Sequence, residues 1–288
     1  MIEIKNMSFG YTREMLFDHL DLAVEPGSIY GLLGKNGAGK TSLLKLIAGL
    51  RFARTGKLGV LGHDPARRPV HLLEDIFFMT EEFTVPPVTP RVYEATYAPF
   101  YPKFDHGMFV ENLKEFELSE KKKLTEVSFG QKKKFHLAFG LATGARILLL
   151  DEPTNGLDIP SKSQFRKILA AACRDDRVIL VSTHQVRDME NLIDPIIILE
   201  GGKIIFQQPM EEVTKRLTVK MEQAEPSGNG IIFSDKTLGG WVVVRPNSSG
   251  EETHMDLETL FNTVIAKPQK VADIFALTGA GKKEAVNG

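Results

Sequence analysis

A contiguous stretch from Gly34 to Thr41, GKNGAGKT, has the residue types of a phosphate-binding loop. It fits the pattern G-x-x-x-x-G-K-[S/T], follows an apolar run typical of a strand, and precedes a periodic run typical of a helix. Backbone N–H groups of such a loop, together with the helix N-terminus, attract phosphate oxygens. The pattern predicts that Lys40 reaches the β- and γ-phosphates of a nucleotide and that the Thr41 hydroxyl is a Mg²⁺ ligand. The candidate nucleotide-binding residues here are Gly34, Lys35, Asn36, Gly37, Ala38, Gly39, Lys40, Thr41 and Ser42.

A second candidate group is the acidic pair Asp151 and Glu152, which ends the apolar run ILLLDE. Ligands of parallel sheets sit at the carboxyl ends of the strands. We expect Asp151 to hold Mg²⁺, through water, and Glu152 to polarise an attacking water. The alternative is a surface pair that caps a following helix, and the phosphate loop in the same chain disfavours it.

Composition and charge limit the classes of protein that fit. The net charge is −1, with 36 Lys and Arg against 37 Asp and Glu, so we expect no nucleic-acid partner held by bulk charge. The single cysteine, Cys173, excludes a disulfide within the chain and favours a reducing compartment. We expect it to be a small buried residue on a helix. No stretch approaches the roughly 18 consecutive apolar residues of a membrane span, so we expect a cytosolic chain that can dock on a membrane protein.

The order of patterns along the chain predicts an α/β fold. Runs typical of β structure fill the first 30 residues, and strands follow near Lys57–Leu61 and Asp75–Met79. Prolines and short helical pieces between about Phe83 and Leu124 indicate an inserted helical subdomain. Continuous apolar strands that alternate with helices, one of them expected at 186–193, resume at Arg146 and favour a mostly parallel sheet. Beyond Leu217, two polar linkers flank a hairpin, two short helices follow, and the last residues, GKKEAVNG, read as a frayed tail.

Several spaced motifs resemble the ATP-binding subunits of ABC transporters. VSFGQKKK resembles the family's signature, usually written LSGGQ, and precedes ILLLDE in the family's order; NGLD resembles the loop after the carboxylate pair. The resemblance implies that Ser128, Gly130 and Gln131 of the signature, and Asp158 of the loop, belong to a nucleotide site. Phe129 departs from the pattern because it stands where the family has a glycine, so its ring must point away from the nucleotide.

The segment STH, after an apolar strand, resembles the family's switch segment and contains His184. We expect His184 to sense the γ-phosphate by hydrogen bonding; the alternative is a capping or core histidine. Tyr11 lies where the family usually has an aromatic that stacks on adenine, whereas an isolated tyrosine in a turn is more often a packing residue.

The family normally has a glutamine at the start of the helical subdomain, and Glu81 stands at that place in IFFMTEEF. Glu82 is the alternative if the alignment slips by one residue. A carboxylate could ligate Mg²⁺ but would add negative charge beside a triphosphate. The other interpretation is a solvated pair of glutamates in a loop.

The resemblance covers roughly residues 1–210 and implies a P-loop NTPase core with an N-terminal antiparallel β subdomain. We therefore assign residues 1–216 to an ABC-type ATP-binding domain, with a helical subdomain at about 83–142. Residues 217–288 form a small α+β C-terminal accessory region. These boundaries rest on the motifs and on the change in composition near Leu217.

The resemblance further implies an ATPase that uses ATP and Mg²⁺, with Lys40, Glu152 and His184 as its catalytic residues. Two such subunits, identical or different, would face each other head to tail and drive transmembrane permease subunits at the inner face of the membrane. The competing interpretations are a soluble relative acting on DNA or ribosomes and a non-hydrolysing regulatory protein. A single phosphate loop without a long coiled-coil insertion disfavours the first, and intact Asp151, Glu152 and His184 disfavour the second.

Overall fold

The computed structural model describes the whole chain except residues 229, 249, 252 and 277–288. Its centre is a six-stranded sheet in the order β5-β6-β7-β3-β8-β9. All neighbours are parallel except β8 and β9, which pair antiparallel. The strands are β3 (Ser28–Leu33), β5 (Ile76–Met79), β6 (Ile147–Asp151), β7 (Val178–Thr183), β8 (Ile196–Glu200) and β9 (Lys203–Gln208). Every residue of β6 and β7 is buried, which explains why both strands are continuous apolar runs.

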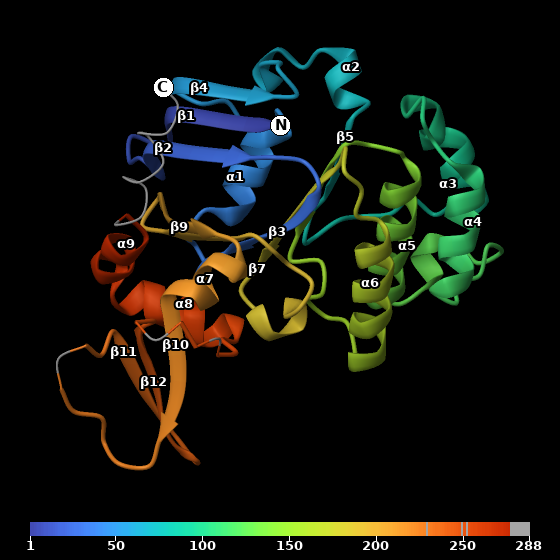
Figure 1. The fold of residues 1–288 in the computed structure, drawn as a ribbon. Helices are drawn as coiled ribbons and strands as arrows, with labels where there is room; N and C mark the ends of the chain where they lie inside the picture. Colours follow the sequence, from blue (N-terminus) through green and yellow to red (C-terminus); the bar gives the residue numbers. More distant parts are fainter. Residues whose placement is uncertain (229, 249, 252, 277–288) are drawn as a thin grey trace, which may run out of the picture.

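The N-terminal part of the chain forms a second, antiparallel sheet (Figure 1). It joins β2 (Phe17–Val24), β1 (Ile2–Phe9) and β4 (Thr55–Val60) in that order. Helix α1 (Lys40–Ile47), the 3₁₀ turn η1 (Pro65–Arg67) and helix α2 (Val70–Leu73) complete this part. One core cluster contains side chains from this sheet, from α1 and from the central sheet. The expected N-terminal antiparallel β structure is thus present.

Helices fill the segment between β5 and β6. They are α3 (Pro90–Tyr97), η2 (Ala98–Phe100), α4 (His106–Glu115), η3 (Leu124–Glu126) and α5 (Phe129–Ala142). Thr89 and Asp105 precede α3 and α4 as N-caps, and their side chains accept backbone N–H groups of the first turns. Gly140 on α5 allows the buried Phe77 ring of β5 to approach, because a Cβ there would lie 2.2 Å from a ring carbon. Helix α5 is therefore fixed directly against the central sheet.

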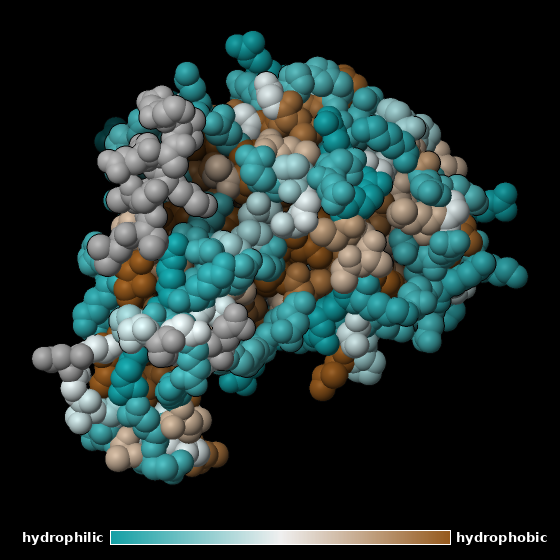
Figure 2. Space-filling view, in the orientation of Figure 1, coloured by the Kyte–Doolittle hydropathy of each residue, from teal (hydrophilic) through white to brown (hydrophobic). Residues whose placement is uncertain are grey.

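Later elements complete the fold. Helix α6 (Ile159–Ala171), the 3₁₀ turn η4 (Val186–Met189) and helix α7 (Met210–Arg216) follow β6, β7 and β9. A projecting three-stranded sheet contains β10 (Leu217–Glu222), β12 (Gly240–Pro246) and β11 (Phe233–Thr237) in that order (Figure 1). Helices α8 (Leu257–Ala266) and α9 (Pro268–Ala276) return to the body of the protein, where Phe275 packs edge-on against Phe206. The space-filling view shows a mixed hydrophilic and hydrophobic surface on the projecting part (Figure 2).

Two local expectations are wrong. Cys173 was expected to be buried on a helix, but it is exposed and lies outside α6, which ends at Ala171. The stretch 186–193, read as a helix between strands, contains only the short turn η4. Asn191 adopts a φ of 63° there, a left-handed conformation that interrupts helical continuation. The predicted tail from residue 281 lies outside the described residues. Within the described residues, no helix is both long enough and apolar enough to cross a membrane.

A side chain added at Gly140 should destabilise the protein, because this glycine lies against the Phe77 ring. In Gly140→Val, the new side chain would overlap the Phe77 ring, and we expect about 2 kcal/mol less free energy of unfolding. Gly59→Val is the matched control, because the nearest atom to a Cβ at Gly59 is the Glu3 carbonyl oxygen at 3.8 Å. Urea denaturation measures both variants. Equal stability of the two variants would contradict this account of how α5 packs.

Candidate active site

The phosphate loop connects β3 to α1 and folds around its own lysine. The Lys40 ammonium donates to the Gly34 carbonyl at 2.8 Å, and the residue is 7% exposed. Gly39, the residue before the helix, has a φ of 107°, and a Cβ there would lie 2.7 Å from the Phe17 ring. Only glycine satisfies both conditions. The sequence therefore predicted this loop and its junction with α1 correctly.

Asp151 lies at the buried end of β6. Its carboxylate accepts the Ser182 hydroxyl at 2.6 Å, which comes from the neighbouring strand β7. Burial raises the pKa of Asp151, whereas hydrogen bonds from Ser182 and Thr41 act in the opposite direction. Asp151 is thus a buried carboxylate held in place beside the start of α1, and it does not cap a surface helix.

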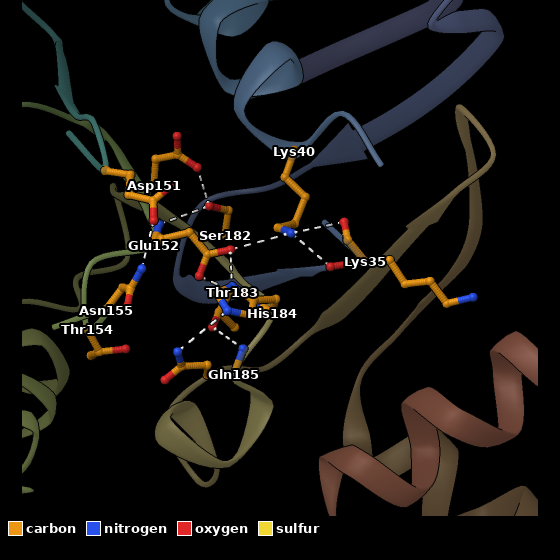
Figure 3. A network of polar contacts seen from close by, with 12 residues as sticks. Lys35, Lys40, Asp151, Glu152, Thr154, Asn155, Ser182, Thr183, His184 and Gln185 are labelled. Atoms are coloured by element: carbon orange, nitrogen blue, oxygen red, sulfur yellow. Dashed lines mark hydrogen bonds and ion pairs between the residues drawn. The ribbon is translucent and has the colours of Figure 1, made fainter. Parts of the chain in front are cut away.

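Glu152 occupies a strained position at which three segments meet (Figure 3). Its φ is 46°, which is unusual for a residue with a side chain. Its backbone N–H donates to the carbonyl and hydroxyl oxygens of Ser182, both at 3.1 Å. Its carboxylate lies 3.4 Å from the Lys40 ammonium and 2.9 Å from Nδ1 of His184. The fold therefore brings Lys40, Glu152 and His184 together at one point.

His184 follows β7 directly and faces Glu152 instead of the core. Its backbone N–H donates to the Glu152 carboxylate at 3.3 Å, and its side chain is 31% exposed. It does not cap the next turn, because η4 begins after Gln185 without a side-chain cap. The position fits neither a capping nor a core histidine.

A cavity of about 600 Å³ lies beside these groups. Tyr11 lines it, with its hydroxyl 2.9 Å from the Ser42 hydroxyl, and the residue is 57% exposed. The remaining lining residues are Leu16, Asn36, Gly37, Ala38, Gly39, Lys40, Thr41, Ser42, Glu81, Glu152, Asn155 and His184. Lys35 differs from the rest of the loop, since its ammonium points away from the site (Figure 3). It pairs with Glu200 at 3.2 Å.

Glu81 lines the cavity and pairs with a residue that follows it by 74 positions in the sequence. Its carboxylate accepts the side-chain amide of Asn155 at 2.8 Å. Glu82 is exposed and does not line the cavity. Of the two alternatives, Glu81 is therefore the carboxylate beside the phosphate loop.

The signature residues do not line this cavity. Ser128 begins α5, where its hydroxyl accepts the Gln131 backbone N–H at 3.2 Å and the Gln131 side chain accepts the Ser128 N–H at 3.0 Å. Gly130 lies between them in the same turn. Asp158 likewise caps α6, and hydrogen bonds from Ser161 lower its pKa. Within one chain, these residues form exposed helix ends outside the cavity.

The Phe129 ring does turn toward the helical segment. It stacks on Phe83, with centroids 6.0 Å apart and planes at 23°, and Lys133 Nζ lies 5.2 Å from its centroid. The side chain thus has packing partners on the protein itself, while it remains 45% exposed.

Three residues near the site lie in the quoted motifs but were assigned no role from the sequence: Asn155, Ser182 and Lys133. Lys133 is fully buried and donates to the Glu152 backbone carbonyl at 2.8 Å. Burial lowers its pKa, while the carboxylates of Glu81, Glu152 and Asp151 act in the opposite direction. Helical spacing could have identified it, because residues 129, 133 and 137 share one face of a helix.

The chain is similar in sequence to known proteins over most of its length. A model of the ABC transporter family matches residues 17–155. The ABC transporter ATP-binding protein YtrB of Bacillus subtilis (strain 168) is 30% identical, over 98% of this chain and 99% of YtrB. The bacitracin transport ATP-binding protein BcrA of Bacillus licheniformis is 29% identical, over 75% of this chain and 72% of BcrA.

Solved structures share the fold. An ATP-binding subunit of an ABC transporter matches with a TM-score of 0.68 and 24% identity, over 74% of this chain and 91% of that chain. A dimeric ATP-binding cassette bound to ADP and Pi, in a post-hydrolysis state, matches with a TM-score of 0.63 and 22% identity. That match covers 73% of this chain and 99% of the cassette.

Proposed function

Because the chain belongs to the ABC transporter family of ATP-binding proteins, we propose that it binds and hydrolyses ATP to power transport through separate membrane-spanning subunits. The observation that carries the proposal is the position of Glu152, between Lys40 and His184 at the edge of the cavity formed by the phosphate loop. Lys40 offers an ammonium that can bind phosphate, Glu152 a carboxylate that can act as a general base, and His184 a hydrogen bond. The transported substrate is set by partners outside this chain.

The contacts of Lys40 suggest how binding prepares the reaction. Its ammonium contacts the Gly34 carbonyl and the Glu152 carboxylate. The phosphates of ATP compete for this ammonium because they carry more negative charge than either partner. Once Lys40 turns to the phosphates, Glu152 can accept a proton from a water aligned with the γ-phosphorus, and His184 orients both. Lys40 offsets charge that develops in the transition state.

The residues around Asp151 fit a Mg²⁺ ion. Mg²⁺ binds proteins through one or two oxygen ligands together with phosphates and waters, and Asp151 and Thr41 offer a carboxylate and a hydroxyl. Among the described residues, no three His, Cys, Asp or Glu side chains cluster as a metal site, which agrees with an ion held largely by the nucleotide. Glu81 is a third candidate ligand. When bound, Mg²⁺ would neutralise charge on the β- and γ-phosphates.

The positions of Ser128, Gly130, Gln131 and Asp158 support a site shared between two chains. Ser128, Gln131 and Asp158 are exposed and Gly130 is half-buried, and all four lie outside the cavity of their own chain. A helix N-terminus favours an anion. In a head-to-tail dimer, with an identical or a different partner, they would contact ATP held by the second phosphate loop. Tyr11 would stack on the adenine, since its ring is exposed beside Ser42.

This function implies that residues 1–216 form the ATP-binding domain, with a helical subdomain at about 83–142, and that residues 217–288 form an accessory region. It also places the chain in the cytoplasm, attached to the inner face of the membrane by permease subunits. Purification of the tagged chain from native membranes in mild detergent tests this association. A membrane-spanning polypeptide should copurify in a fixed ratio; recovery of the chain alone in the soluble fraction would contradict the transport role.

Glu81 yields a prediction about metal dependence. We expect Glu81→Gln to tighten ATP binding in the absence of Mg²⁺ by about threefold to tenfold, because it removes a negative charge beside the triphosphate. With Mg²⁺ the gain should be smaller or reversed, since the ion offsets that charge. Titration with a fluorescent ATP analogue, with and without Mg²⁺, measures the effect. Glu82→Gln is the control. If it tightened ATP binding equally, the effect would come from the net charge of the protein and not from the position of Glu81.

A further inference from the structure

Lys133 is a fully buried lysine in the second turn of α5. Its ammonium donates to the backbone carbonyl of Glu152 at 2.8 Å and lies 5.2 Å from the ring centroid of Phe129, one turn earlier. The side chain therefore spans from the signature end of α5 to the base of the candidate active site. Its neighbours differ: Lys132 is partly exposed, and Lys134 donates to Gln164 at 2.8 Å.

The stability of the folded chain does not by itself explain a buried lysine at position 133. A buried ammonium loses its hydration, and a well-packed apolar side chain of similar volume is often equally or more stabilising. The flanking face of α5 is apolar at Leu137 and Leu141, so a methionine would suit the packing. The charge and the hydrogen bond of Lys133 therefore point to a role at Glu152.

The backbone of Glu152 needs such support. Its left-handed φ of 46° is costly for a residue with a side chain, so surrounding contacts must hold it. Ser182 binds the N–H side of this residue. On the carbonyl side, Lys133 donates together with the Asn155 N–H, which lies at 3.2 Å. A shift of the Glu152 backbone would displace its carboxylate from Lys40 and His184.

We propose that Lys133 is a positioning residue that fixes the backbone of Glu152 and thereby links the signature end of α5 to the catalytic carboxylate of the same chain. The proposal rests on the function proposed above. In the dimer, the partner's ATP would bind at Ser128 while Lys133, five residues further along α5, holds Glu152 against the chain's own ATP. Closure at one site would then set the geometry of the base at the other.

Steady-state kinetics of two substitutions test the proposal. Lys133→Met keeps length and packing but removes the donor, and we expect kcat to fall by about tenfold or more with KM for ATP nearly unchanged. Lys133→Gln retains an N–H donor on an uncharged side chain and should recover part of kcat. Lys134→Met is the matched control and should behave as the wild type.

A double mutant separates positioning from general destabilisation. If Lys133 acts through Glu152, adding Lys133→Met to Glu152→Gln should cause little further loss of kcat. An unchanged kcat in Lys133→Met, equal losses in Met and Gln variants, or a loss that tracks a lower melting temperature would each overturn the proposal. An inactive wild type would instead remove the proposed function, so the two failures are distinguishable.

Discussion

Glu152→Gln is expected to retain ATP binding and to lose turnover by a factor of about 10² to 10⁴, the usual contribution of a general base. The substitution removes the proton acceptor but keeps the size of the side chain. Lys40 would still be available for phosphate, because its other contacts are the backbone carbonyls of Gly34 and Lys35. The nucleotide should therefore bind at least as tightly as in the wild type.

Glu152→Gln is also expected to change the oligomeric state of the chain. Since ATP would remain intact between the two chains, the variant should accumulate as an ATP-bound dimer detectable by size-exclusion chromatography. Glu115→Gln, on the outer surface where Glu115 pairs with Lys167, is the control for loss of a carboxylate. Wild-type turnover in Glu152→Gln would exclude Glu152 as the base.

Ser128→Arg is expected to abolish turnover while the isolated chain binds ATP normally. Ser128 does not line the cavity of its own chain, so a large cationic side chain there should obstruct only the nucleotide of the partner. The substitution also removes a helix cap, because Ser128 accepts the Gln131 N–H. Loss of the cap alone costs about 1 kcal/mol.

Ser128→Ala and Ser128→Thr separate these two effects. The alanine variant loses the cap without adding bulk, and the threonine variant keeps a hydroxyl that can cap the helix. If Ser128→Arg were inactive only because α5 frays, Ser128→Ala would be nearly as impaired. Single-turnover hydrolysis and equilibrium ATP binding should be measured on all three. Weakened ATP binding by the monomeric Ser128→Arg chain would contradict a site shared between chains.

Features with a local cause could be predicted from the sequence. The phosphate loop is encoded by consecutive residues, and the glycine at position 39 meets a local need for positive φ. The start of α5 follows from Ser128 and Gln131, which form a reciprocal capping pair. The two buried strands that end at Asp151 and Thr183 were evident from continuous apolar runs.

Features with a distant cause could not be predicted. The pairing of Glu81 with Asn155 depends on how the helical segment returns to the sheet. In the sequence, Lys133 is one of three consecutive lysines in VSFGQKKK, and the resemblance assigns it no role. The fold shows that this lysine turns inward and meets the carbonyl after a buried strand. Helical periodicity gives its direction, but only the packed structure supplies its partner.

The central claim is that each active site combines the phosphate loop and Glu152 of one chain with the signature end of the other. Mixing the two inactive variants, Ser128→Arg and Glu152→Gln, tests it directly. In a mixed dimer, one site keeps an intact Glu152 from one chain and an intact Ser128 from its partner, while the other site carries both changes. If the chains exchange freely, we predict at most roughly a quarter of the wild-type ATPase rate, because half the dimers are mixed and each has one site with both intact residues. Coupling between the two sites through Lys133 would lower this rate without abolishing it. A mixture that forms mixed dimers yet stays as inactive as its components would contradict the account.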